Sequence, residues 1–321
     1  MNVLVVNDTH FGSNYALVSE DKIQNAYQEW VYQQYLDVVK RCQLIGIDLL
    51  VPIGDLVDGY AAKDSTMQWT TDVHNQANCA VELLKKFMNS NTKVIGVGGS
   101  GYHWGKGTGF DGDRMVIEAL GGKYNKNHYY LETPHGIIQF THVGKNIKTE
   151  IETLQKNNGE LDFKVKMLVN GHLHRYSAYY MGSVQVIHCP CWQYPTDFMQ
   201  GHGVAPTVDI GCILIQIDEY GIIGHTPFKY PIPLNVTKEM SGWETINEDE
   251  LKEKDKRDWE KLAQLSKVSS NSIQKIKRVE RENLTILSLP EPPMINLREK
   301  KKRQNLILPT LPPSPEIRKY K

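Results

Sequence analysis

The first half of the chain alternates short apolar runs with longer segments of helical character. Three runs rich in branched apolar residues are predicted as buried strands, at 2–6, 48–55 and 93–99. Helices are expected at 19–43, 66–89 and about 112–120. In the first of these, apolar side chains recur at spacings of three and four, which predicts one buried face. Ser19 and the two acidic residues that follow it are expected to begin this helix.

Strand-like runs come close together after residue 125. They are HYYLE, GIIQFTH, KMLVNGH, YSAYYM, VQVIHC, DIGCILIQI and GIIGHTPF, and one helical stretch at about 146–157 interrupts them. A chain that first alternates strands with helices and then has mostly antiparallel strands favours two packed sheets with helices outside. We therefore expect an α/β fold over residues 1–235, a two-sheet β-sandwich flanked by helices.

The composition changes in the last part of the chain, residues 236–321. Residues 247–283 are rich in charged side chains and suit a helix stabilised by pairs four residues apart. Beyond residue 284, seven prolines surround the basic run REKKKR at 298–303. Such a segment cannot bury a core of its own. This part is predicted to be a charged, Pro-rich C-terminal extension, partly helical or flexible.

The formal net charge of zero hides an uneven distribution. Residues 251–321 hold 18 Lys and Arg against nine Asp and Glu, whereas the first 250 residues hold 19 against 28. A basic extension on an acidic body suits a nucleic acid or another phosphate-rich partner. A solvated tail without a partner is the alternative of equal weight.

The sequence also predicts where the protein is located. It has no run of about 18 apolar residues, so we expect no membrane span. The opening MNVLVVNDTH lacks the features of a signal peptide. Five scattered cysteines indicate free thiols in a reducing compartment. Cys189 and Cys191 have no second pair that would complete a zinc site. We therefore expect a cytoplasmic protein.

Acidic and imidazole side chains follow three of the predicted strands. Asp8 and His10 follow the first strand, Asp55 follows the second, and His172 and His174 follow the run KMLV. In α/β folds, ligands bind outside the carboxyl ends of strands. Residues two apart in an extended segment also point to the same side. These spacings predict a metal site at the strand ends.

The donor types narrow the choice of metal. Carboxylate together with imidazole suits Mn, Fe, Zn, Co or Ni better than Ca. A carboxylate such as that of Asp55 can bridge two ions about 3.5–4 Å apart, and such a pair activates water and neutralises phosphoryl charge. We expect two divalent ions, with Mn²⁺ preferred and Fe, Zn, Ni or Co as alternatives.

An ordered set of motifs resembles the calcineurin-like metallophosphoesterase superfamily. The motifs lie within about residues 1–230 and are Asp8/His10, Gly54/Asp55/Asp58, Gly101/His103, His142 and Gly171/His172/His174. The resemblance implies a four-layer sandwich around a dinuclear metal centre. It implies one metal held by Asp8, His10 and His174. The second metal would be held by His142 and His172, with Asp55 as the bridge. Asp58 is instead expected to cap a turn or a helix.

The turn after the third strand departs from the family pattern. The family usually has G-N-H-[DE] there, with Asn as a metal ligand, and this chain has GGSGYHWG at 98–105. The second metal is therefore short of one ligand. His103 is expected either to bind metal or to be the catalytic acid that protonates the leaving oxygen. The segment is similar to a variant in phage-borne members, which would place the protein in a bacterial host's cytoplasm.

These features predict a metal-dependent phosphoesterase in which a metal-bound hydroxide attacks phosphorus in line. The preferred substrate is a phosphodiester of DNA or RNA, which would make the protein a nuclease. The basic tail, the phage-like turn and the loop aromatics Trp192, Tyr194 and Phe198 motivate this choice, because aromatics can stack on bases. Ordinary loop packing is the favoured alternative for the aromatics. A phosphomonoesterase acting on a nucleotide or phosphoprotein is one alternative function, and an inactive binding scaffold of the same fold is the other.

Overall fold

The computed structural model of the 321-residue chain describes residues 1–60, 67–103, 110–142, 147–160, 165–196, 208–240 and 256. The chain divides into two compact units, Met1–Thr245 and Ile246–Lys321. Apart from Lys256, the second unit lies outside the described residues, and so do the expected charged helix and the Pro-rich tail. The domain division at 235 and the nature of the extension stay predictions.

The first sheet is built around the N-terminal strand. Within the described residues it has six strands in the order β11–β10–β1–β2–β3–β4. They are β1 (Asn2–Val6), β2 (Leu49–Pro52), β3 (Lys93–Val97), β4 (Lys123–Asn125), β10 (Ile210–Asp218) and β11 (Gly221–Tyr230). Strands β1 to β4 are parallel, so their carboxyl ends meet at one edge, whereas β10 and β11 are antiparallel.

The second sheet contains the close-set strands of the later sequence. Its order, over the part of the chain that is described, is β5–β6–β7–β9–β8. The strands are β5 (His128–Thr133), β6 (Gly136–Thr141), β7 (Val165–Asn170), β8 (Ser177–Met181) and β9 (Val184–His188). The three central strands are parallel, and only the edge pairs are antiparallel. The expected excess of antiparallel pairing is therefore absent from the centre of this sheet, because helix α4 (Ile147–Glu160) connects β6 to β7.

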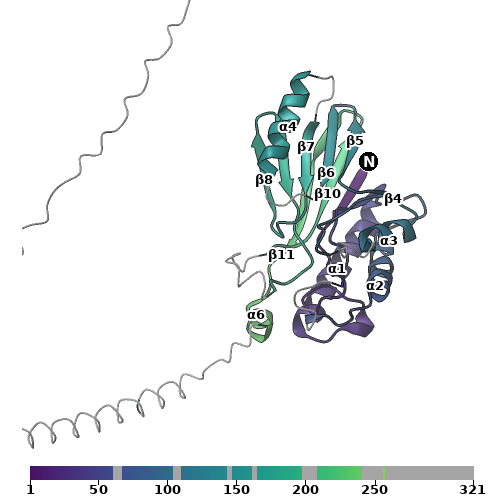
Figure 1. Ribbon diagram of the computed structural model, residues 1–321, viewed down its shortest axis with the longest axis vertical. Coiled ribbons are helices and arrows are strands. Elements are labelled where there is room, and N and C mark those ends of the chain that lie inside the picture. Colours follow the sequence, from purple (N-terminus) through teal and green to yellow (C-terminus); the bar gives the residue numbers. More distant parts are fainter. Residues whose placement is uncertain are drawn as a thin grey trace, which may run out of the picture. The chain divides into compact units, whose positions relative to one another are not determined.

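Three cores show that the molecule has four layers. On β1, Val3 and Val5 join a core between the two sheets, and Leu4 and Val6 face the helices, as the two-residue period of a strand requires. Helices α1 (Ala26–Ile45), α2 (Val73–Lys85) and α3 (Gly112–Ala119) cover the first sheet, and α4 covers the second (Figure 1). The expected α/β sandwich flanked by helices is confirmed.

Two helices begin later than the sequence predicts. Asn25 rather than Ser19 caps α1, because its side chain accepts a hydrogen bond from the backbone N–H of Gln28, whereas residues 20–22 form a separate 3₁₀ turn. Asp72 caps α2 in the same way. The residues just before Asp72 pair with the loop after β1, and they are therefore not available to extend the helix.

Two elements were not predicted. Strand β4 is only three residues long and has the sequence KYN, so it lacks the apolar run that indicates a strand. Helix α6 (Leu234–Met240) lies across the predicted boundary at residue 235 and buries Val236 in the core beside α1. Among the described helices, none combines the length and the apolar character that crossing a membrane requires.

Candidate metal centre

The carboxyl ends of four parallel strands bring the predicted site residues together. Asp8 and His10 follow β1 and Asp55 follows β2, whereas His142 follows β6 and His172 follows β7. The backbone N–H of His10 donates to the carbonyl of Asp55, which joins the first two loops at 3.0 Å. The backbone N–H of His172 donates to Oδ2 of Asp8 at 2.8 Å, which joins the two sheets. The site therefore contains residues from both sheets.

The backbone is strained at the predicted ligands. Among the described residues, the non-glycine positions with positive φ are Asp8, His10, Asp55, His172 and His174, with φ between 43° and 75°. Each such residue costs on the order of 1–3 kcal/mol, and such strain clusters at functional sites because the fold must overdetermine it. All five are residues that the sequence singled out as metal ligands. This coincidence is independent of their side-chain chemistry.

Two glycines allow this close approach. A Cβ at Gly54, where φ is +76°, would meet Gly99 and the ring of His142. A Cβ at Gly171 would meet the same ring and the side chain of Asn7. The glycines that precede Asp55 and His172 therefore leave the space that the His142 ring occupies.

The first group of donors forms a compact triangle. Nε2 of His10 and Nε2 of His174 are 3.4 Å apart, and they lie 3.7 Å and 3.4 Å from Oδ1 of Asp8. Ligands about 2.1 Å from a tetrahedral ion lie roughly 3.4 Å apart. The triangle thus has the dimensions of three ligands on one transition-metal ion.

The second group is arranged around the ring of His142. Its Nδ1 donates to the carbonyl of Ile53 at 2.8 Å, which directs Nε2 to Oδ2 of Asp55 at 3.0 Å. Metal-binding histidines usually have this arrangement, in which one ring nitrogen donates to a carbonyl and the other binds the ion. His172 completes the group, with its donor atom within 4.8 Å of those of Asp55 and His142.

The side chains present fit a cation in the first group. Oδ1 of Asp8 is fully buried and accepts no hydrogen bond, although ring nitrogens of His10, His142 and His174 lie within 3.8 Å of it. A buried carboxylate oxygen without a partner is costly. A cation between this oxygen and the ring nitrogens of His10 and His174 would give the oxygen a partner.

The carboxylates of the site favour positive charge on the histidines. Burial lowers the pKa of His10, but the neighbouring carboxylates of Asp58, Asp8 and Asp55 together outweigh burial and raise this pKa to about 10. Burial also lowers the pKa of His142, and the charges of Asp55 and Asp8 outweigh it and raise the pKa to about 10. Burial raises the pKa of the Asp55 carboxyl, but the charges of His142 and His103 and the hydrogen bond from His142 together outweigh burial, so this pKa lies below its ordinary value. The site is built to hold positive charge.

Asp58 lies next to the rings of the site rather than in a cap. Its side chain is buried, and Oδ1 is 3.6 Å from Nδ1 of His10 and 3.9 Å from Nδ1 of His103. Oδ2 accepts a hydrogen bond from the side chain of Gln68 at 2.5 Å. Asp58 therefore lies beside two of the site's histidines, a placement that the expected cap does not describe.

Asp113 is a site residue that sequence reasoning missed. From α3, its carboxylate accepts hydrogen bonds from the backbone N–H groups of Asp55, Leu56 and Gly99 at 2.7–3.1 Å. Burial and the nearby charge of Asp55 raise its pKa to about 7. In the sequence its one signal is an acidic residue in the first turn of a helix, which usually indicates only a favourable interaction with the helix dipole.

The loop aromatics pack inside the protein. Trp192 is fully buried and Tyr194 is 6% exposed, and both belong to the core beneath the helices. Phe198 lies outside the described residues. The favoured interpretation, ordinary loop packing, is confirmed for Trp192 and Tyr194, so these two rings are not free to stack on a base.

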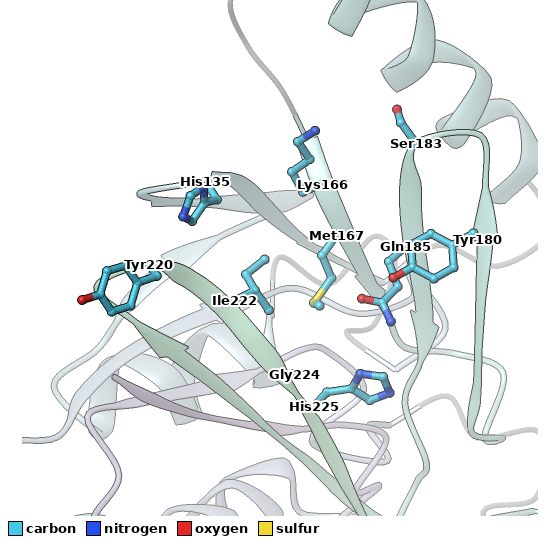
Figure 2. Close-up of a pocket in the computed structure, with 10 residues that line it drawn as sticks. All are labelled: His135, Lys166, Met167, Tyr180, Ser183, Gln185, Tyr220, Ile222, Gly224 and His225. Atoms are coloured by element: carbon cyan, nitrogen blue, oxygen red, sulfur yellow. The ribbon is translucent and has the colours of Figure 1, made fainter.

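A pocket of about 570 Å³ lies away from these donors. It opens between β11 and the second sheet, where Lys166 and Met167 lie near the start of β7, and contains none of the predicted ligands (Figure 2). Strand β7 runs from this pocket toward the site. The pocket and the candidate metal centre therefore lie at opposite ends of the strand.

Comparisons with known proteins give similarity of structure alone. No family model matches the chain, and no curated protein matches it. Vps29 of Entamoeba histolytica in complex with Zn²⁺ is 14% identical with a TM-score of 0.39, over 71% of this chain and 99% of that one. An archaeal phosphodiesterase is 10% identical with a TM-score of 0.38, over the same shares. A predicted phosphoesterase of Streptococcus pneumoniae is 13% identical with a TM-score of 0.32, over 71% and 97%. Because these TM-scores are below 0.5, the function must be inferred from the residues of the site.

Proposed function

We propose that this protein is a metal-dependent phosphoesterase with a dinuclear centre. The observation that carries the proposal is the convergence of six carboxylate and imidazole donors, five of them on strained backbone. Strain of this kind is retained where function requires a fixed geometry. Carboxylate with imidazole is a donor set for Mn, Fe, Zn, Co or Ni, and Mn²⁺ is our first choice.

The ligands divide between two positions. Asp8, His10 and His174 would hold one cation. His142 and His172 would hold the other. Asp55 would lie between them, because its carboxylate oxygens come within 4.8 Å of donors on His10 as well as on His142. Cations bound in such a pair activate a water molecule and neutralise the charge of a phosphoryl group.

The protein's own side chains fix the geometry in which this chemistry takes place. Asp8 and Asp55 are almost fully buried, so their charges act in a medium that screens them weakly. His172 is only partly buried and has a pKa lowered by burial and by His142, so it offers a neutral ring nitrogen near the surface. His103 offers only Nε2 to the site, because its Nδ1 donates to the carbonyl of Asp58.

The preferred substrate class is a phosphodiester of nucleic acid. The basic extension, with 18 Lys and Arg against nine Asp and Glu, favours a polyanionic substrate. The burial of Trp192 and Tyr194 removes base stacking from that argument. A phosphomonoesterase with the same centre is the second candidate, because the donor set alone does not discriminate between the two ester types.

An inactive binding scaffold is the alternative from another class. A scaffold gains nothing from keeping six metal-binding side chains, five of them on strained backbone, so the geometry favours catalysis. Asp55→Asn separates the two functions. An enzyme would lose activity with its fold intact, whereas the partner binding of a scaffold would not change.

The test of the proposal compares two model esters. Metal-stripped full-length protein is assayed with bis-p-nitrophenyl phosphate and with p-nitrophenyl phosphate, before and after Mn²⁺ is added back. Diester cleavage that returns with metal supports the proposal, and nuclease assays with and without residues 240–321 would then follow. Cleavage of the monoester alone would favour the phosphomonoesterase. Metal-loaded protein that cleaves neither ester nor any nucleic acid would favour the scaffold.

A further inference from the structure

We propose that Nε2 of His103 is an additional metal ligand, at the edge of the site formed by His10 and Asp55. This inference rests on the proposed metal centre and assigns one of the two roles that the sequence left open. Donor atoms of His10, Asp55 and His103 lie within 4.8 Å of one another. They form a third group that shares a member with each of the other two groups.

The loop that carries His103 is fastened to the loop that carries Asp55. The backbone N–H of Ser100 donates to Oδ1 of Asp55 at 2.6 Å, and the backbone N–H of Gly99 donates to Asp113 at 2.7 Å. The carbonyl of His103 lies so close to Gly59 that a Cβ there would collide with it. These backbone contacts fix the position of the His103 ring at one edge of the site.

The orientation of the ring leaves one nitrogen for a ligand. Nδ1 of His103 is 2.9 Å from the carbonyl oxygen of Asp58, which can only accept, so Nδ1 carries the hydrogen. In the neutral ring, Nε2 then has a free lone pair, and it lies 3.9 Å from Oδ2 of Asp55. A carbonyl partner on one nitrogen and a free lone pair on the other is the usual arrangement of a metal-binding histidine. His142 likewise directs its Nδ1 to a backbone carbonyl, that of Ile53.

The neighbours of His103 identify the cation that it would bind. Its ring centroid is 4.5 Å from that of His10, which belongs to the triangle with Asp8 and His174. Its donor atom groups with those of His10 and Asp55 and with neither His142 nor His172, so it lies on the His10 side of Asp55 and does not replace the asparagine expected on the second cation. The second cation would keep Asp55, His142 and His172 as its side-chain donors, which leaves coordination positions for water or substrate.

The experiment follows the binding of Co²⁺ to the full-length, metal-stripped protein by calorimetry and visible absorption. The variants are His103→Ala and His103→Gln, and the matched control is Tyr102→Phe, at the exposed neighbouring position of the same loop. We expect two bound ions in the wild type. His103→Ala should weaken one of them by about 10-fold or more and change the absorption spectrum, since even residues that only orient ligands cost 10–100-fold in affinity. His103→Gln, whose amide oxygen can coordinate, should recover part of the loss.

Two results would overturn the ligand role of His103. One is a His103→Ala protein whose two affinities and spectrum match those of the wild type. The other is unchanged metal binding together with a hydrolysis rate that falls more for poorer leaving groups, which would make His103 the acid. Failure of this inference and failure of the proposed function are distinguishable, because a wild-type protein that binds no Co²⁺ contradicts both. A wild type that binds two ions beside an unaltered His103→Ala contradicts the ligand role alone.

Discussion

Both ends of the sandwich contain histidine side chains, but in different surroundings. At one end, Asp8, His10 and Asp55 are buried and lie on strained backbone, and His10 has donor atoms within 4.8 Å of those of both carboxylates. At the other end, the pocket is lined by His135 and Lys166 among others, and both of these side chains are exposed (Figure 2). No described residue that lines the pocket is a non-glycine with positive φ.

The difference indicates where chemistry can take place. The pocket is hollow, but its polar side chains are spread around an opening and can be hydrated there. The candidate metal centre is compact, and Oδ1 of Asp8 lacks a hydrogen-bond partner in it. Convergent buried donors therefore indicate function better than open volume does.

The largest effect is expected at Asp55, which two of the three donor groups share. Asp55→Asn should lower metal-dependent phosphoester hydrolysis by about 100-fold or more, because residues that merely support ligands already cost 10–100-fold. The measurement is the rate with saturating Mn²⁺, alongside circular dichroism to verify the fold. The control is Asp48→Asn, at the exposed position just before β2, the strand that Asp55 follows. Its hydrolysis rate should stay within about 2-fold of the wild-type rate.

The next effect concerns Asp113, which ties together the Asp55 and Gly99 loops. Asp113→Ala leaves three backbone N–H groups without their acceptor, so the free energy of unfolding should fall by about 3 kcal/mol. Asp113→Asn keeps an acceptor oxygen and should lose about 1 kcal/mol. Chemical denaturation measures both, with Glu118→Gln on the exposed face of the same helix as control. Equal stability of Asp113→Ala and the wild type would contradict this role.

A pH effect should distinguish the site end from the rest of the molecule. His10 and His142 have pKa values raised to about 10, so both rings are protonated at neutral pH and must release protons when a cation binds. Apparent metal affinity should therefore rise as pH increases from 6.5 toward 10. In the protein without cations, the stability that these rings contribute is present below about pH 6.5 and is lost as pH rises toward 10.

Calorimetry in buffers with different ionisation enthalpies counts the released protons. The expected value is about two per chain near pH 8, one from each of these rings. Metal binding with no proton release would contradict the charge balance described for the site.

The smallest effect should be seen at the pocket end. Lys166→Ala and His135→Ala alter exposed side chains away from the candidate metal centre. The hydrolysis rate should therefore change by less than about 2-fold, and the free energy of unfolding by less than about 0.5 kcal/mol. A large loss of hydrolysis in either variant would show that the pocket end also contributes to the activity, which would contradict the difference described between the two ends.

The ordered motifs made much of the fold and the site residues predictable. The apolar run at β1 and the Asp8–His10 spacing behind it predicted a strand end that carries donors, and the structure brings these donors to His174. The roles of Asp113 and Asn7 could not be predicted. Asp113 acts through backbone groups far away in the sequence, and Asn7 acts through its hydrogen bond to Asp8 and its packing against Gly171. Contacts of that kind depend on the packing of loops, which periodicity does not encode.

The helix boundaries could not be predicted because neighbouring residues compete for the capping position. Serine is a common N-cap residue, but the hydroxyl of Ser19 donates a hydrogen bond to the side chain of Asp21. Asn25 caps α1 instead. The roles of the aromatic residues were equally dependent on context, because Trp192 could be assigned to the core only once the loop was folded.

The most direct test of the central claim is a titration of metal-stripped protein with Mn²⁺. Bound metal and the hydrolysis of bis-p-nitrophenyl phosphate are followed in the same samples. If the centre is dinuclear and catalytic, hydrolysis is absent at the start, returns with bound metal and reaches its maximum at two ions per chain. Two ions bound without hydrolysis of any phosphate ester, or hydrolysis that persists after the metal is removed, would contradict the central claim.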